Sequence, residues 1–245
     1  MRKEKRKKRK ERNESNFPVF SLLLLALFAF FPLSALAAVP FNWAIHGSVF
    51  HFAADNGVDS DPAPILPSLG FSASWPWRGL FRLELTQDLY FTNYEYNWER
   101  GHAMGSSLEN RSAFVMGFIT GFQAVGFFPI GNDGMAARIY AGPALDLRIV
   151  TLAFGLNHPD DFLGDDRDAQ RQTDAIRRYF WGSGRWIFST AGFGMDFPVN
   201  ERFLLGFDMR VWFPVYRLWT DRHLPAIDGW RFGAGFRITP RRIEI

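Results

Sequence analysis

From residue 41 onward, apolar residues occupy every second position in runs of about ten residues or more. In the clearest run, residues 80–91, Phe81 and Leu83 alternate with Arg82 and Glu84. Because successive side chains of a strand point to opposite faces, such a run has one apolar face and one ionic face. A soluble sandwich must cover the apolar face with a second protein layer, whereas a membrane barrel covers it with lipid and encloses the ions. The pattern favours the membrane barrel; a soluble ligand-binding barrel is the alternative.

Eight such runs follow one another along the chain. The period of two predicts strands at about residues 42–52, 66–75, 79–92, 111–127, 135–153, 185–197, 202–219 and 229–239. An even number of strands is expected of a bacterial barrel made from one chain. The predicted fold class is therefore all-β, an eight-stranded antiparallel up-and-down transmembrane β-barrel in a domain of residues 38–245.

The connections between these runs alternate between short and long. The short ones, rich in Pro, Gly, Asn and Asp, are residues 76–78, 128–134 and 198–201, and the long ones are about 53–65, 93–110, 154–184 and 220–228. Short periplasmic turns and longer external loops are typical of outer-membrane barrels. Several runs are longer than a bilayer crossing needs, so we expect the sheet to extend beyond the bilayer on the external side.

The loop 154–184 differs from the others in its charge pattern. Asp165, Asp166 and Asp168 precede a segment whose apolar residues include Ala169, Ile176, Tyr179 and Phe180, and Arg177 and Arg178 lie near its end. Acidic residues before a helix and basic residues at its end complement the helix dipole. The loop is therefore expected to hold a short helix over the barrel mouth, serving as a lid or a binding surface, or simply packing on the rim.

The inward faces of the strands carry charges of both signs. The inward charged residues are Arg82, Glu84, Asp88, Arg138, Asp146, Arg148, Asp196, Asp208, Arg210, Arg231 and Arg237. Six are positive and five negative, so they can nearly neutralise one another. An eight-stranded barrel is just wide enough for side chains to fill it, and mixed charges are tolerated there when they pair. We expect a lumen ion-pair network that closes most of the barrel.

Aromatic residues gather near the predicted strand ends, as in the interfacial belts of membrane proteins. The expected periplasmic band is Trp43, Trp75, Trp77, Phe127, Phe128 and Phe197, and the expected outer band is Phe91, Tyr94, Tyr96, Trp98, Trp186, Trp212, Tyr216, Trp219 and Trp230.

The first residues of the chain predict export. Nine basic residues among the first sixteen precede an apolar stretch at 17–38, which ends in Ala35-Leu36-Ala37. This order is typical of a secretory signal peptide, here residues 1–37, with an uncleaved membrane anchor as the alternative. Removing it takes nine basic and three acidic residues away and changes the formal charge from +3 to −3. The chain has no cysteine, which excludes disulfides and thiolate metal sites.

Evidence for catalysis, metals or nucleic acid is weak. His46 and Ser48 share a strand face, as a nucleophile and its base would, but no recognisable enzyme motif surrounds them. His102, His158 and His223 lie in three different long loops, and the aspartates of residues 160–168 lack EF-hand spacing. We expect no enzyme activity, no cofactor, no metal and no nucleic-acid partner.

With its leader, its eight amphipathic runs and the strand-like end Gly229-Trp230-Arg231-Phe232-Gly233-Ala234-Gly235-Phe236-Arg237-Ile238, the chain resembles the small outer-membrane barrels of the OmpA, OmpX and OmpW type. It differs at its last residues, Ile243-Glu244-Ile245, where such barrels often end in an aromatic residue. The resemblance implies a monomer in outer-membrane lipid of a bacterial cell, with a structural or surface-interaction role that reaches host or extracellular ligands through the external loops. The alternative that the OmpW-like members imply is a narrow channel for small or apolar solutes.

Overall fold

The computed structural model describes residues 42–53, 65–98, 101–105, 113–131, 133–152, 169–218 and 229–241. The predicted signal peptide lies outside the described residues, as do His158, His223 and the aspartates of residues 160–168. None of the helices in the described part of the chain is long and apolar enough to cross a membrane.

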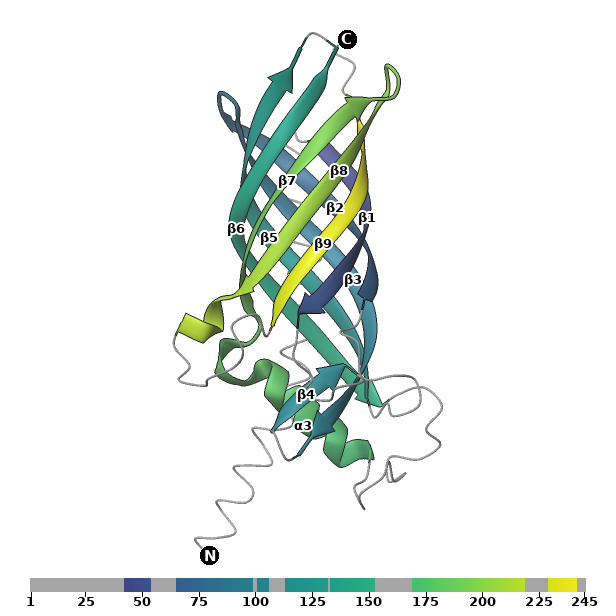
Figure 1. The fold of residues 1–245 in the computed structure, drawn as a ribbon, viewed down its shortest axis with the longest axis vertical. Coiled ribbons are helices and arrows are strands. Elements are labelled where there is room, and N and C mark those ends of the chain that lie inside the picture. The colour runs from purple at the N-terminus through teal and green to yellow at the C-terminus, as the bar shows by residue number, and fades with distance from the viewer. Residues whose placement is uncertain are drawn as a thin grey trace, which may run out of the picture. The chain divides into compact units, whose positions relative to one another are not determined.

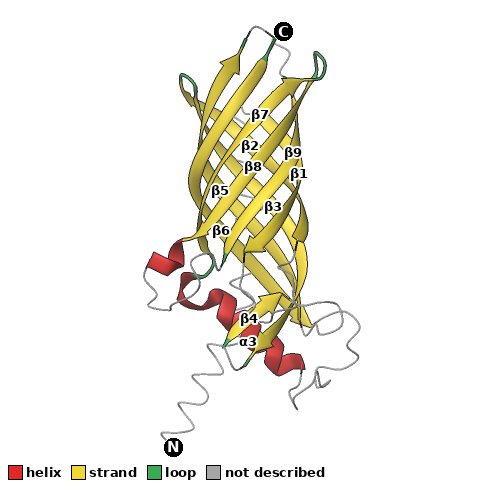
Figure 2. Ribbon diagram, in the orientation of Figure 1, coloured by secondary structure: helices red, strands yellow, loops and turns green. Residues whose placement is uncertain are grey.

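The strands are β1 (Asn42–Ala53), β2 (Ile65–Arg78), β3 (Phe81–Asn97), β4 (His102–Gly105), β5 (Ala113–Ile130), β6 (Met135–Leu152), β7 (Ile187–Pro198), β8 (Phe203–Pro214) and β9 (Trp230–Pro240). The helices are α3 (Ala169–Trp181) and the short 3₁₀ helices η2 (Gly182–Gly184) and η3 (Val215–Leu218). All strands except β4 form one closed antiparallel ring, in which each strand pairs with the next along the chain and β9 returns to pair with β1. The predicted eight-stranded up-and-down barrel is confirmed (Figures 1 and 2).

The strand boundaries differ from the expected ones where proline or an extra hairpin intervenes. Residues 76–78, expected as a turn, belong to β2, because the irregular pairing between Pro76 and Arg78 accommodates a proline. β8 ends at Pro214, short of the expected residue 219, and η3 follows. β3 continues to Asn97 and pairs with β4, so part of the expected loop 93–110 is a small hairpin.

The two ends of the barrel have different structures. One end, here called the turn end, holds the start of β1, the end of β9 and the short connections between neighbouring strands (Figure 1). At the opposite end, the loop end, β3, β5 and β6 extend and carry α3. Ile176 and Phe180 of α3 are buried against Tyr94, Val115 and Val150 of those strands. The helix expected in the third long loop is present, with its first described residue at Ala169.

Candidate functional site

The inward-facing side chains fill the lumen in levels between the loop end and the turn end. Nearest the loop end are two groups: a loop-side ion cluster of Tyr90, Asp146, Arg148 and Arg231, and an aromatic layer of Phe50, Phe52, Leu66, Tyr90, Ile119, Ala144, Phe188 and Trp212. A central ion cluster follows, made of His46, Asp88 and Arg210. Nearest the turn end is a turn-side ion cluster of Glu84, Arg138, Tyr140, Asp196, Asp208 and Arg237. Tyr90 belongs to the first two.

The loop-side ion cluster is built around Asp146 of β6. Arg231 donates from Nη2 to Asp146 Oδ2 at 2.5 Å, Arg148 pairs with the same oxygen, and the Tyr90 hydroxyl donates to Oδ1 at 2.9 Å. Aromatic rings cover the two cations: Arg148 stacks on Phe180 of α3, with its Cζ 4.2 Å from the ring centroid, and Arg231 stacks on Phe52 and Phe188. Two arginines against one carboxylate leave this buried level with an excess positive charge that the ring faces help to stabilise.

The aromatic layer crosses the barrel next to this cluster. Phe50, Tyr90 and Trp212, from β1, β3 and β8, make edge-to-face contacts, with the Phe50 ring centroid 5.5 Å from each of the other two. The Tyr90 ring lies over Gly117, its register partner on the neighbouring strand β5, where a Cβ would lie about 2 Å from the tyrosine ring. β1, β2, β3, β5, β6, β7 and β8 contribute side chains to the layer, and β9 contributes the stacked Arg231.

The central ion cluster joins three strands that are distant in sequence. Asp88 of β3 accepts from His46 Nε2 at 2.7 Å and from Arg210 Nη1 at 3.0 Å, so its two oxygens each have one partner. All three side chains are buried. Ser48 does not contact this histidine: its hydroxyl bonds to that of Ser68 at 2.6 Å. The geometry therefore does not bring His46 and Ser48 together as a catalytic pair.

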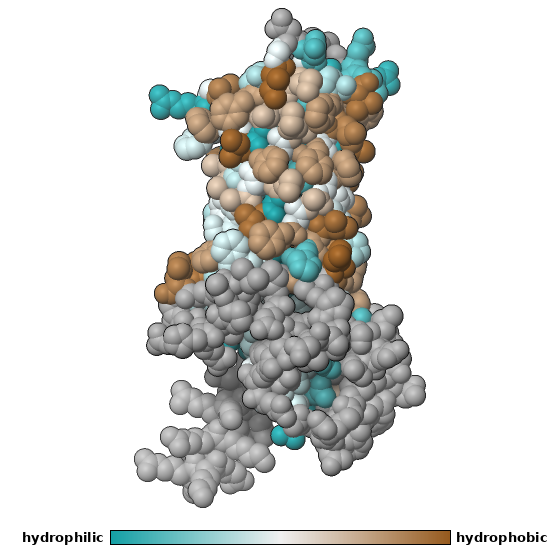
Figure 3. All heavy atoms as spheres, viewed as in Figure 1, coloured by the Kyte–Doolittle hydropathy of each residue, from teal (hydrophilic) through white to brown (hydrophobic). Residues whose placement is uncertain are grey.

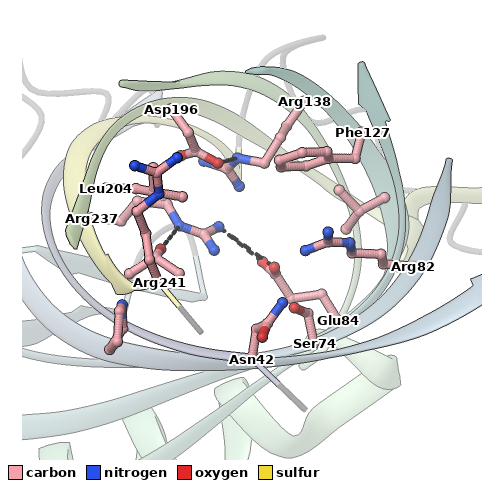
Figure 4. Close-up of a pocket in the computed structure, with 13 residues that line it drawn as sticks. Asn42, Ser74, Arg82, Glu84, Phe127, Arg138, Asp196, Leu204, Arg237 and Arg241 are labelled. Atoms are coloured by element: carbon pink, nitrogen blue, oxygen red, sulfur yellow. Dashed lines mark hydrogen bonds and ion pairs between the residues drawn. The ribbon is translucent and has the colours of Figure 1, made fainter. Parts of the chain in front are cut away.

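The turn-side ion cluster has Arg138 of β6 at its centre. Arg138 pairs with Asp196 at 2.9 Å and with Asp208 at 2.8 Å. Arg237 and Glu84 approach each other at 3.5 Å, the longest of the lumen ion pairs in the part of the chain that the structure describes. A cavity of about 210 Å³ lies beside these pairs at the turn end (Figure 4).

The structure brings ten of the eleven predicted lumen charges into ion pairs with one another or with His46. Arg82 is the exception. Its guanidinium lines the cavity and stacks on Phe127, with Cζ 4.4 Å from the ring centroid, and it forms no ion pair with any described residue.

The expected outer aromatic band is wrong at three positions. Tyr94, Trp212 and Tyr216 are buried, and Trp212 is only 2% exposed. Trp212 lies between Val211 and Phe213, so the period of two places it on the inward face, and that signal outweighs its position near a strand end. The same periodicity points Phe50 and Tyr90 inward, and could have predicted the aromatic layer.

No cluster of His, Cys, Asp and Glu suited to a metal ion occurs among the described residues. The two loop histidines at 158 and 223 and the aspartate run lie outside that part of the chain, so the structure does not address them.

Many large apolar side chains are exposed on the outside of the barrel, and Figure 3 shows one face of this surface. The exposed ones on the strands include Trp43, Ile45, Val49, Leu69, Phe71, Phe122, Ile139, Phe193, Met209, Phe232, Phe236 and Ile238. Exposed apolar surface on this scale is unfavourable in water and is what hydrocarbon chains cover. A closed ring of strands with such a surface is the form in which β-sheets cross the outer membrane of bacteria, so the chain is an outer-membrane barrel.

No protein-family model matches the chain, and no curated protein matches it. Several solved structures are similar to it in fold. Neisserial surface protein A has 12% identity and a TM-score of 0.46, over 82% of this chain and 97% of that one. The outer-membrane protein OprG of Pseudomonas aeruginosa has 14% identity and a TM-score of 0.45, over 82% of this chain and 96% of that one. The attachment invasion locus protein Ail of Yersinia pestis, in complex with the heparin analogue sucrose octasulfate, has 9% identity and a TM-score of 0.41, over 82% and 96%.

Proposed function

We propose that this protein is a closed outer-membrane barrel that does not conduct ions, and that it has a structural or surface-interaction role at its loop end. The observation that carries the proposal is the filled lumen. Seven strands contribute side chains to the aromatic layer, and the Arg231 guanidinium stacks on two rings at the same level. A constriction lined by rings excludes water and offers an ion no ring of oxygen atoms to replace its hydration shell, so the passage of ions is unfavourable.

The loop end adds a second obstruction. Phe180 of α3 contacts the Tyr94 ring at a centroid distance of 4.9 Å and stacks on Arg148, and Arg177 donates to the Val150 carbonyl. These contacts hold α3 on the inward-facing side of the extended strands. A helix fixed in this way offers its exposed Arg171 and Arg178 as a preformed charged surface, which suits contact with an external ligand.

We also infer that the protein is not an enzyme. His46 is bonded to Asp88, Ser48 is bonded to Ser68, and both pairs lie inside the filled barrel. A nucleophile needs a base within hydrogen-bond reach and a path for the substrate, and these residues have neither.

Conductance in planar lipid bilayers tests the closed lumen. Protein purified from outer membranes is expected to give no resolvable single-channel current. The double variant Phe50→Ala, Trp212→Ala removes two rings of the aromatic layer and is expected to conduct. The matched control is Phe232→Ala, Phe236→Ala, which removes two outward rings and should remain silent.

Folding of each variant is checked by heat-modifiable migration on a gel, which separates folded from unfolded barrel. A steady current through the wild-type protein would overturn the closed lumen, whether or not the double variant folds. Such a current would favour the narrow channel for small or apolar solutes.

We further propose that residues 1–37 are removed on export and that the remaining chain acts as a monomer in outer-membrane lipid. The basic start, the apolar stretch and the Ala-Leu-Ala exit support cleavage after Ala37. Amino-terminal sequencing of protein from the outer membrane is expected to begin at Ala38. A sequence that begins at Met1 or Arg2 would mean an uncleaved anchor.

A further inference from the structure

The cavity at the turn end is lined by residues from all eight wall strands, so it lies inside the barrel and not on its side (Figure 4). Its volume is about 210 Å³. This space is large enough for several waters. It is smaller than pockets for drug-sized ligands, which run to several hundred Å³, and suits a small polar ligand.

The lining of the cavity is cationic. Arg82, Arg138, Arg237 and Arg241 face two carboxylates, those of Glu84 and Asp196. Arg138 and Arg237 pair with these two carboxylates, and Arg138 also pairs with Asp208, which does not line the cavity. The site keeps an excess of positive charge even when Asp208 is counted.

Arg82 and Arg241 carry that excess. Arg82 stacks on the Phe127 ring, and Arg241 donates from Nη1 to the Asn200 carbonyl at 3.4 Å; neither pairs with a carboxylate among the described residues. Both side chains are half-buried at the turn end, so water solvates them when no ligand is present. An anion that displaces this water gains two charged donors that no carboxylate of the described residues already occupies.

We propose that this cavity binds a small phosphate-type oxyanion, either inorganic phosphate or the phosphate group of a small monoester. The donors come from different walls, since Arg82 lies on β3 and Arg237 and Arg241 lie at the end of β9 (Figure 4). A planar carboxylate presents its acceptors along one edge, whereas a tetrahedral phosphate presents oxygens in all directions. Guanidinium groups form short, charge-assisted and often bidentate bonds with phosphate.

The position of the cavity defines the side from which the ligand enters. The lining residues lie at the turn end, which faces the periplasm when the long loops are external. The aromatic layer separates this cavity from the loop end. The site is thus a dead-end pocket filled from the periplasm and not a step along a channel.

Isothermal titration calorimetry on the protein in nonionic detergent tests the proposal. Three probes are titrated: inorganic phosphate, glycerol phosphate and acetate. Saturable binding of phosphate, glycerol phosphate or both is expected, with acetate at least tenfold weaker. Arg82→Gln replaces the charged guanidinium by a shorter, neutral amide and is expected to weaken phosphate binding about tenfold or more. Arg82→Lys keeps the charge and should weaken it less.

The matched control is Arg78→Gln, an exposed arginine at the end of β2 that does not line the cavity, which should leave phosphate binding unchanged. Binding of only one phosphate probe tells whether the natural ligand is the free ion or an ester. Absence of saturable binding by both phosphate probes at millimolar concentration would overturn the proposal. So would equal affinity of the wild type and Arg82→Gln, or acetate binding as tight as phosphate.

Discussion

The loop-end half and the turn-end half of the lumen both bury charge, but they stabilise it in different ways. At the loop end, Asp146 has three donors, and aromatic rings cover its two arginines. At the turn end, the Glu84–Arg237 pair is 3.5 Å long and borders a cavity. The comparison indicates that charges sealed from water are stabilised by a shared carboxylate and by aromatic ring faces, whereas charges beside a polar cavity can rely on water.

This difference also fits the two tasks proposed for the barrel. In the proposed function the sealed half blocks passage, because rings and paired ions cross the lumen at that level. The open half keeps guanidinium groups available for a ligand. The following substitutions test whether the two halves differ in stability as their structures imply.

The largest effect is expected for Asp146→Ala. Without this carboxylate, Arg148 and Arg231 remain buried between rings with no counterion, which should lower the free energy of unfolding by about 3–5 kcal/mol. Urea titration of the barrel in lipid vesicles measures the change. The matched control is Asp174→Ala. Asp174 Oδ1 lies 2.9 Å from Arg177 Nη1, and the side chains of both residues are almost half exposed. It should cost about 0.3–0.5 kcal/mol. Equal losses in the two variants would refute the idea that the loop end is sealed from water.

A slightly smaller effect is expected for Trp212→Ala. Trp212 is 2% exposed and contacts the Phe50 ring, so its removal leaves a cavity in the aromatic layer. The expected loss is about 3 kcal/mol, and it is measured by the same urea titration. Phe236→Ala is the control, because Phe236 is 62% exposed on the outer face and lipid chains can fill the space it leaves. If Phe236→Ala were the more destabilising of the two, the lumen would not be the tightly packed part of the barrel.

Most of the fold could be predicted because alternation is a local property of the sequence. The period of two placed Asp88, Asp146 and Arg138 on the inward face, where the structure has them buried. Boundaries were less accurate at Pro76 and Pro214, since whether a proline ends a strand or is accommodated in an irregular pairing depends on the neighbouring strand.

The partners of each lumen charge could not be predicted in this way. Arg210 and Asp88 are 122 positions apart, and Arg237 and Glu84 are 153 apart. Their meeting depends on the stagger between strands around the whole ring, which no single strand encodes. The same holds for the turn-end cavity, because all eight wall strands contribute residues to its lining.

The smallest effect is expected for Glu84→Gln. Its ion pair with Arg237 is long, and the cavity beside it lets water solvate the arginine that remains. The loss of unfolding free energy should therefore be about 1 kcal/mol or less, well below that of Asp146→Ala.

The same substitution removes a negative charge from the lining, so phosphate should bind more tightly to Glu84→Gln than to the wild type, as measured by calorimetry. A loss as large as that of Asp146→Ala would show that the turn end is as dry as the loop end. Phosphate binding that weakens would mean that Glu84 positions the arginines and does not merely oppose the anion.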